Sequence, residues 1–264
     1  MTIEGIGPDL KTTLRRLRLS RLLDTLPQRL VLARQQQMGH QDFLQLVLAD
    51  EVARREGATL NMRVKRAGLD PGMRLEEWDA GTPVSYDRAL FNELVSLRFL
   101  ETHAHVAIVG PVGVGKTFLA HARGHLACGQ GYEVQALRCD RMLKTLKHGR
   151  LDDTYEAELE KLKTVDLLIL DDFGLDTMDP TESRDAYEIM TERDRTGSII
   201  ITSNRGPDEW LGTFADPVRA QSAVDRFTSR AYDLVIDGAS YRQRLKPGLA
   251  SAGRAGHKEV NLVN

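Results

Sequence analysis

The sequence has only two cysteines, Cys128 and Cys139, and they do not form a CxxC pair. Two isolated thiols provide neither a disulfide framework nor a set of zinc ligands. We therefore interpret both as buried or chemically idle thiols.

Long apolar runs are also absent, because no stretch of the sequence approaches the ~18 residues that a transmembrane helix requires. The N-terminus, MTIEGIGPDLKTTLRRLRL, carries charged residues where a secretory signal would have an apolar stretch. We expect a protein that makes no membrane contact and stays in the cytoplasm.

There is no large excess of charge of either sign. The 36 basic and 38 acidic side chains give a formal net charge of −2. This balance excludes a uniformly basic surface of the kind that coats nucleic acid, so any contact with DNA must come from a local patch.

The first part of the chain has a helical pattern. Apolar residues recur at helical spacing from Leu10 to about Gln37, and Pro27 should kink or break this helix. Two further helical patterns follow, and the last ends near Gly68, a residue type favoured just past a helix C-terminus. We predict a helical N-terminal domain over residues 1–69, followed by a linker over 70–84 that is rich in Pro, Gly and acids.

Residues 85–246 have the pattern of an α/β domain. Ser85 is expected to cap a helix that runs to about Leu100. Short β-branched runs then alternate with helical stretches, at 105–110, 133–137, 165–172, 198–204 and 232–237. Such runs indicate a parallel sheet covered by helices on both faces. We expect the small, polar tail at 247–264 to be disordered.

A glycine-rich motif follows the first of these strands. Residues 110–117, GPVGVGKT, match GxxxxGK[ST] and stand between an apolar strand and a helix. The glycines let backbone N–H groups converge on phosphates, Lys116 can reach the β- and γ-phosphates, and the Thr117 hydroxyl can ligate Mg²⁺. The residues predicted to bind ATP are Gly110, Pro111, Val112, Gly113, Val114, Gly115, Lys116, Thr117 and Phe118.

Two later strands end in polar residues that complete the predicted site. The run VDLLILDD ends in Asp171, which would hold Mg²⁺ through its water shell, and in Asp172, which could orient or deprotonate the attacking water. The run SIIITSN ends in Asn204, whose amide could hold that water in line. The alternative for Asn204 is an ordinary turn residue before Gly206 and Pro207.

With these residues identified, the chain resembles the AAA+ ATPases of the DnaC/IstB type. Within that type it is more similar to the IstB family, the transposition helper ATPases of IS21-family insertion sequences. The features that carry the resemblance are RLRLSRLLDTL, DEVARRE, GPVGVGKT, LLILDDFG, ITSNR and GASYR, in matching order and spacing over roughly residues 10–245.

The resemblance implies a five-stranded AAA+ sheet and a homo-oligomeric ring or spiral with nucleotide between neighbouring subunits. It also implies an arginine finger acting in trans, at Arg226 of DRFTSR or, as second choice, at Arg230. The alternative for Arg226 is a surface ion pair. One feature departs from most AAA+ proteins: Asp172 stands where glutamate is usual, and its shorter side chain could slow hydrolysis.

A basic cluster follows the second strand. Five basic residues stand against one acidic residue between positions 138 and 150. The residues predicted to contact DNA phosphates are Arg141, Lys144, Lys147 and Arg150, the first three of which share one helix face. The alternative is a solvated helix face paired with the acidic stretch 152–160. The basic run from Lys11 to Arg21 could also contact DNA, a partner or another subunit.

These features and the resemblance together predict a slow ATPase, stimulated by assembly or DNA, that oligomerises on DNA with little sequence preference and, as the resemblance implies, engages a transposase. A helicase loader of the DnaC type is the alternative, because it would share nearly every motif. Another alternative is a small-molecule P-loop kinase, which would need an acceptor pocket and a mobile lid and would not depend on Arg226 or on oligomerisation. A binding switch would hold ATP and barely cleave it.

Overall fold

The computed structural model describes residues 6–79, 81 and 84–241, so the tail expected to be disordered lies outside the described residues. The chain divides into two compact units, residues 1–62 and 63–264. Among the described residues, no helix combines the length and the apolar character needed to cross a membrane.

The first unit is helical. Its helices are α1 (Pro8–Arg16), α2 (Leu22–Gln35) and the first part of α3 (His40–Arg66). A small core forms where the apolar stripes of these helices meet, and its buried members are Leu14, Leu22, Leu26 and Val47. The apolar residues at helical spacing thus form the core of this unit.

Two sequence predictions for these helices are wrong. Pro27 lies inside α2, and the chain turns earlier, at residues 17–21, where Arg18 has φ +58°. A proline inside a helix costs about 3 kcal/mol, whereas burial of Leu22 and Leu26 contributes about 1.5–3 kcal/mol each, so packing keeps the helix intact. The second and third predicted helices are one continuous helix, α3, of 27 residues.

The second unit contains a five-stranded parallel sheet in the order β3-β4-β5-β2-β6. Its strands are β2 (His105–Val109), β3 (Val134–Arg138), β4 (Leu167–Asp171), β5 (Ser198–Ser203) and β6 (Ala231–Val235). All five predicted runs are therefore strands. The interior strands β4 and β5 are buried along their whole length, as expected for a parallel sheet covered on both faces.

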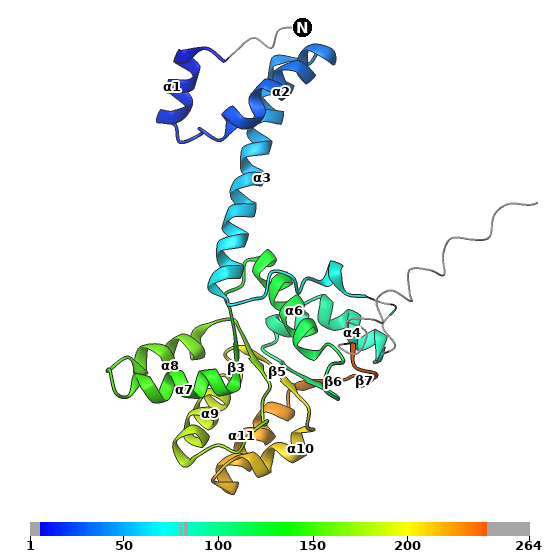
Figure 1. The fold of residues 1–264 in the computed structure, drawn as a ribbon, viewed down its shortest axis with the longest axis vertical. Helices are drawn as coiled ribbons and strands as arrows, with labels where there is room; N and C mark the ends of the chain where they lie inside the picture. The colour runs from blue at the N-terminus through cyan, green and yellow to red at the C-terminus, as the bar shows by residue number, and fades with distance from the viewer. Residues whose placement is uncertain (1–5, 80, 82–83, 242–264) are drawn as a thin grey trace, which may run out of the picture. The chain divides into compact units, whose positions relative to one another are not determined.

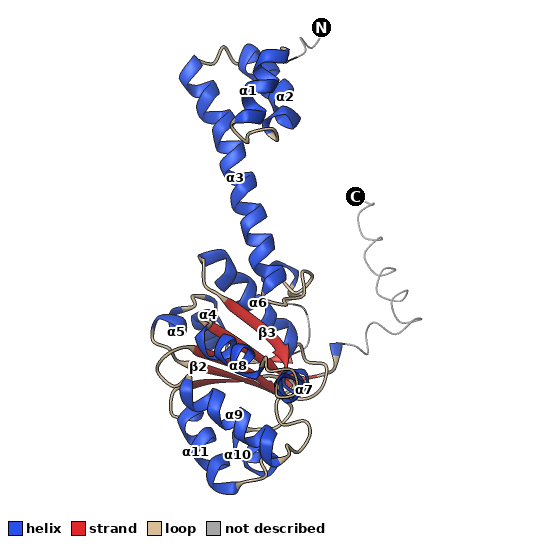
Figure 2. Cartoon of the chain, turned by 90° about the vertical axis from the view of Figure 1, so that its left-hand side faces the viewer, coloured by secondary structure: helices blue, strands red, loops and turns tan. Residues whose placement is uncertain are grey.

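Helices cover both faces of this sheet (Figure 1 and Figure 2). On one face lie α4 (Arg88–Val95), α5 (Arg98–Glu101) and α6 (Lys116–Gln130). On the other face lie α7 (Cys139–Gly149), α8 (Tyr155–Thr164), α9 (Pro180–Glu192) and α11 (Pro217–Thr228). This second group of helices shares one apolar core with β4 and β5.

Short elements connect and flank these layers. They are η1 (Leu75–Glu77), α10 (Pro207–Trp210), η2 (Leu211–Thr213) and an antiparallel pair formed by β1 (Val84–Ser85) and β7 (Asp237–Gly238). Ser85 therefore belongs to a strand and is not the predicted helix cap. Asp87 caps α4 instead, because its carboxylate accepts hydrogen bonds from the N–H groups of Ala89 and Leu90 at 2.8 and 3.0 Å.

Both cysteines are free and buried, as interpreted from the sequence. Burial raises the pKa of Cys139 to about 12. A thiol of that kind stays protonated at neutral pH and is unreactive.

Candidate functional site

The glycine-rich loop lies between the end of β2 and the start of α6, where the carboxyl ends of the parallel strands meet. Gly113 has φ +88° and Gly115 has φ +98°, a backbone region that residues with a Cβ atom rarely adopt. The left-handed Gly115 immediately precedes α6. The N–H groups at the start of this helix therefore face the strand ends, which is the geometry of an anion site.

Lys116 is the first residue of α6 and is 7% exposed. Its ammonium group donates hydrogen bonds to the carbonyl oxygens of Gly110 and Pro111, both at 2.7 Å, and to Oδ1 of Asn204 at 2.6 Å. The ammonium is thus held inside the loop and beside the end of β5. This brings together two residues that the sequence assigned to the site separately.

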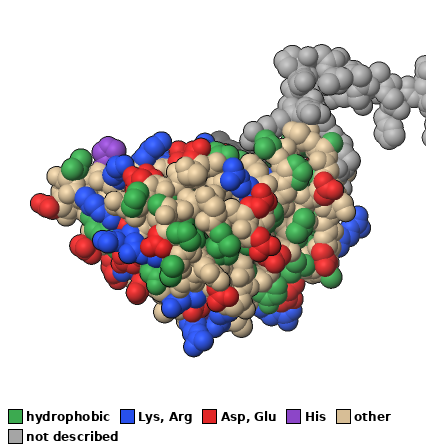
Figure 3. All heavy atoms as spheres, turned by 90° about the horizontal axis from the view of Figure 1, so that it is seen from below, with side chains coloured by type: hydrophobic (Ala, Val, Ile, Leu, Met, Phe, Trp, Pro, Cys, Tyr) green, Lys and Arg blue, Asp and Glu red, His purple; other side chains and the backbone are tan. Residues whose placement is uncertain are grey.

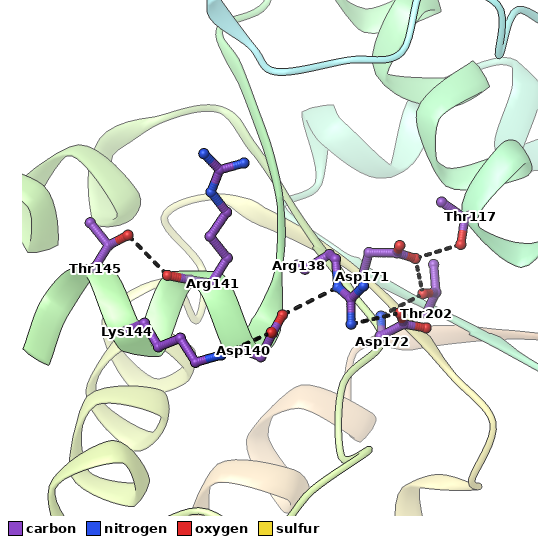
Figure 4. A network of polar contacts seen from close by, with 9 residues as sticks. All are labelled: Thr117, Arg138, Asp140, Arg141, Lys144, Thr145, Asp171, Asp172 and Thr202. Carbon is purple, nitrogen blue, oxygen red and sulfur yellow. Dashed lines mark hydrogen bonds and ion pairs between the residues drawn. The ribbon is translucent and has the colours of Figure 1, made fainter.

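Asp171 and Thr117 meet at the end of β4. The Thr117 hydroxyl donates to Oδ1 of Asp171 at 2.8 Å, and the Thr202 hydroxyl on β5 donates to the same oxygen (Figure 4). A hydroxyl and a carboxylate are the hard oxygen ligands that Mg²⁺ uses alongside phosphate and water. The pair predicted to hold the metal is therefore assembled with chemistry that fits the ion.

Asp172 follows β4 directly and has φ +57°, a left-handed conformation that aspartate and asparagine tolerate better than most residues. Its N–H donates to Oγ1 of Thr202 at 3.1 Å. Its carboxylate lies 3.6 Å from the guanidinium of Arg138 and is 34% exposed. The side chain therefore turns away from the buried strand toward the same opening as Lys116.

A pocket of about 500 Å³ contains the P-loop. Its polar lining includes Lys116, Thr117, Asp172 and Asn204, and its apolar lining includes Met73, Trp78, Val112, Phe118, Leu175 and Tyr241. The volume is within the usual range for small-molecule sites. Residues predicted for phosphate binding and water orientation thus share one cavity with Thr117, the hydroxyl ligand predicted for the metal, while its partner Asp171 is not part of the lining.

Several contributors to this site were missed by the sequence reasoning. Thr202 and Arg138 contact the two aspartates, while Trp78 and Tyr241 line the pocket. Thr202 carried a weak signal, since it is a hydroxyl near the polar end of an apolar strand. Trp78 lies within the predicted linker, but its ring packs against Phe118 with centroids 5.4 Å apart.

The two arginine-finger candidates differ in their surroundings. Arg226 lies in the last turn of α11, is exposed, and has no ion-pair or hydrogen-bond partner for its side chain among the described residues. Arg230 donates from Nη2 to the carbonyl oxygen of Thr102 at 2.6 Å. Arg226 does not line the P-loop pocket of its own subunit.

The basic cluster forms one side of α7. Figure 4 shows the Arg141 side chain extended from the helix, with no dashed line to the other side chains drawn there. Lys144 lies 3.5 Å from Asp140, and Lys147 donates to Asp179 at 2.9 Å. The latter hydrogen bond raises the pKa of the Lys147 ammonium. Their acidic partners are thus not in the stretch 152–160 that the sequence suggested.

Arg150 differs from the other three basic residues. Its guanidinium pairs with both carboxylate oxygens of the buried Asp185 and lies 3.9 Å from the ring centroid of Tyr155. A cation held in this way braces α7, α8 and α9. The structure therefore ties the guanidinium of Arg150 to Asp185, while its side chain stays 30% exposed.

Charge on the surface is mixed in the view of Figure 3, where basic and acidic side chains are interspersed and no large area of one sign is visible. This agrees with the small net charge of −2. A contact with a polyanion would have to use a local group of cations such as the one on α7.

The parallel sheet, the P-loop after β2 and the paired aspartates after β4 define an ATP-binding protein of the AAA+ class. The chain belongs to the family of IstB-like ATP binding proteins, whose family model matches residues 12–248.

Two relatives and one solved structure illustrate this placement. An insertion-sequence protein of Mycobacterium tuberculosis, provisionally described as ATP-binding, is 38% identical over 242 residues, 91% of this chain and 96% of that protein. An IS21 protein of Pseudomonas aeruginosa with the same provisional description is 32% identical over 238 residues, 90% of each chain. The replication initiator DnaA bound to AMPPCP and single-stranded DNA matches with a TM-score of 0.52 and 26% identity, over 63% of this chain and 50% of that longer one.

Proposed function

We propose that this protein hydrolyses ATP, binds DNA with little sequence preference, oligomerises on it and engages a transposase, and so regulates DNA transposition. The observation that carries the proposal is the single pocket in which Lys116, Thr117, Asp172 and Asn204 meet. The insertion-sequence context of its relatives supports transposition as the process.

In this proposal each residue of the pocket has one task. Lys116 exchanges the oxygen atoms of Gly110, Pro111 and Asn204 for the β- and γ-phosphates. Thr117 and Asp171 hold Mg²⁺, which when bound neutralises phosphate charge. Asp172 orients and activates the attacking water, and Asn204 helps to align it. Because Asp172 and Asn204 line the same pocket, both can reach a water beside the γ-phosphate.

The surroundings of Arg226 support its use as an arginine finger on a neighbouring subunit. A finger must be exposed and free of competing anions, and it must reach another subunit's nucleotide. Arg226 is exposed and lies outside the pocket lining of its own subunit. Arg230 meets these conditions less well, because its guanidinium is hydrogen-bonded to Thr102.

We expect Arg226→Ala to lower ATP turnover by about 10- to 100-fold, because it removes one charge-assisted contact of about 1.5–3 kcal/mol in the transition state. ATP binding to isolated subunits should stay nearly unchanged. Phosphate release is measured at a protein concentration that supports assembly. Arg219→Ala, on the same helix and paired with Asp216, is the matched control.

Mixed oligomers test whether the finger acts in trans. Subunits with Arg226→Ala are mixed with subunits carrying Asp172→Asn. Some interfaces in the mixture then pair an intact Arg226 with an intact Asp172, so turnover should rise above that of either variant alone. Arg226→Ala oligomers that hydrolyse at the wild-type rate would move the finger elsewhere, with Arg230 next in line.

Arg141, Lys144 and Lys147 are the proposed DNA contacts on α7. The exposed fractions of Lys144 and Lys147 are 69% and 57% despite their acidic partners. Exposed ion pairs contribute only about 0–1 kcal/mol, so a DNA phosphate can compete for both lysines. Arg150 is left out of this surface, because its guanidinium is committed to Asp185.

We expect the triple variant Arg141→Ala/Lys144→Ala/Lys147→Ala to depend less on salt when it binds duplex DNA. The slope of the logarithm of the binding constant against the logarithm of the salt concentration should become shallower by about 2–3, since each phosphate contact contributes ~0.9. Affinity should fall without a change in sequence preference. Fluorescence anisotropy over a salt series, with ATP present throughout, measures this. The charge-matched control is Arg184→Ala/Arg195→Ala/Arg219→Ala on other elements. If the triple variant still assembles and its slope equals that of the wild type, the basic run from Lys11 to Arg21 becomes the next candidate for the DNA contact.

The test of the proposed function as a whole is ATP turnover with and without DNA. Turnover that rises with DNA and with protein concentration supports it. A small-molecule kinase would transfer phosphate as a monomer regardless of DNA. ATP held without cleavage under all conditions would indicate a binding switch.

A further inference from the structure

The last described residues, 236–241, form a strap that lies against the P-loop. The N–H of Ile236 donates to the carbonyl of Val109 at 2.8 Å, and the N–H of Tyr241 donates to the carbonyl of Gly113 at 2.8 Å. The contact is close enough that a Cβ atom on Gly113 would come within 2.1 Å of Oγ of Ser240. The backbone of the strap is thus fixed to the loop that binds phosphate.

The Tyr241 side chain has no hydrogen-bond partner among the described residues, although its backbone is anchored. It is 39% exposed and lines the P-loop pocket. The other aromatic rings of this wall are already paired, since Trp78 packs against Phe118 at 5.4 Å and against Tyr86 at 6.5 Å. Tyr241 has no ring partner among the described residues. An unpaired ring at the wall of a ligand pocket is available to stack on a ligand.

The lining of the pocket combines two chemistries. Lys116, Thr117, Asp172 and Asn204 contribute the polar groups that would fix the triphosphate. Apart from the carboxylates of Glu77 and Asp79, the other side chains of the lining, including Met73, Trp78 and Tyr241, are largely apolar. A nucleoside joined to a phosphate chain that the polar groups hold has this apolar wall within reach. Base and ribose are the flat, partly apolar groups that such a wall accommodates.

We propose that Tyr241 is a nucleotide-contacting residue that recognises the nucleoside of ATP, and that the strap positions its ring by binding Gly113. This inference rests on the proposed function for the placement of the triphosphate on Lys116. Nucleoside recognition here comes from a segment that follows the last strand of the sheet. The phosphate loop and the nucleoside contact are then connected by one backbone hydrogen bond.

Calorimetric titration with AMPPCP and with inorganic tripolyphosphate, both with Mg²⁺, tests this inference. Tyr241→Ala should weaken AMPPCP binding by about 5- to 100-fold, the range for loss of a base-stacking ring. Tripolyphosphate, which has no nucleoside, should bind Tyr241→Ala as it binds the wild type. Tyr241→Phe keeps the ring and should bind both ligands normally. Tyr132→Ala, whose ring lies outside the pocket lining, is the control.

Two results would overturn the inference. AMPPCP affinity equal to wild type in Tyr241→Ala would mean that the ring makes no contact with the nucleoside. An equal loss for AMPPCP and tripolyphosphate would mean that the strap only shapes the P-loop. Failure of the proposed function is a separate result, because it would appear as wild-type protein that binds AMPPCP normally but shows no DNA-stimulated turnover.

Discussion

Lys116→Ala is expected to lose ATP binding almost completely while the protein stays folded. The ammonium group is nearly buried and donates hydrogen bonds to oxygen atoms of Gly110, Pro111 and Asn204. It therefore supports the phosphate site and not the apolar core. Removing one partner of a buried charge pair costs about 2–5 kcal/mol, a loss of roughly 30- to 3,000-fold in affinity.

Titration calorimetry with AMPPCP measures this loss, and thermal unfolding checks that the fold is retained. Lys161→Ala provides the control, because Lys161 is exposed on α8 and pairs with Glu158 outside the P-loop pocket. If Lys116→Ala kept its affinity for AMPPCP, the nucleotide would have to bind elsewhere in the chain.

Asp172→Asn is expected to keep ATP binding and to lose hydrolysis by about 10²- to 10⁴-fold, the usual contribution of a positioned general base. The amide keeps the shape of the side chain but lacks the negative charge and basicity that activate water. The fold should tolerate the change, because asparagine adopts the left-handed conformation at φ +57° as readily as aspartate. The ion pair lost with Arg138 is partly exposed and contributes little to stability.

Single-turnover phosphate release and AMPPCP titration separate the two effects of this change. The variant should also accumulate in the ATP-bound, assembled state, which sedimentation with ATP would detect. Wild-type turnover by Asp172→Asn would remove this residue from the mechanism.

Asp172→Glu tests the departure from the usual AAA+ pattern, in which glutamate stands at this position. A faster rate would show that the short side chain limits hydrolysis, and an unchanged rate would show that its length is not limiting.

The strands and the phosphate loop could be predicted from the sequence because their signals are local. A buried parallel strand needs an apolar run, and all five runs became strands of one sheet. The P-loop needs glycines, a lysine and a threonine at fixed spacing, and these residues lie next to one another in the chain. The helices of the first unit were less predictable, because the chain continues through Pro27 and turns at residues 17–21.

The residues that surround the predicted site depend on strand order, which the sequence does not specify. Thr202 reaches Asp171 because β5 lies beside β4, although the two residues are 31 positions apart. Arg138 reaches Asp172 because β3 pairs with β4 in a register that sets Arg138 opposite Asp171. The same dependence applies to Arg150, whose partner Asp185 is 35 positions away on another helix.

The sequence by itself determined the class of chemistry, since the residue types that bind phosphate and magnesium stand at the ends of apolar strands. Only the tertiary structure decided which cations remain free, which are committed to internal pairs, and which aromatic rings line the pocket. The physical reason is that a charge or a ring acts through distances of a few ångströms. Those distances are set by the pairing of β3, β4 and β5 in the sheet and by the hydrogen bonds that join the strap at 236–241 to Val109 and Gly113.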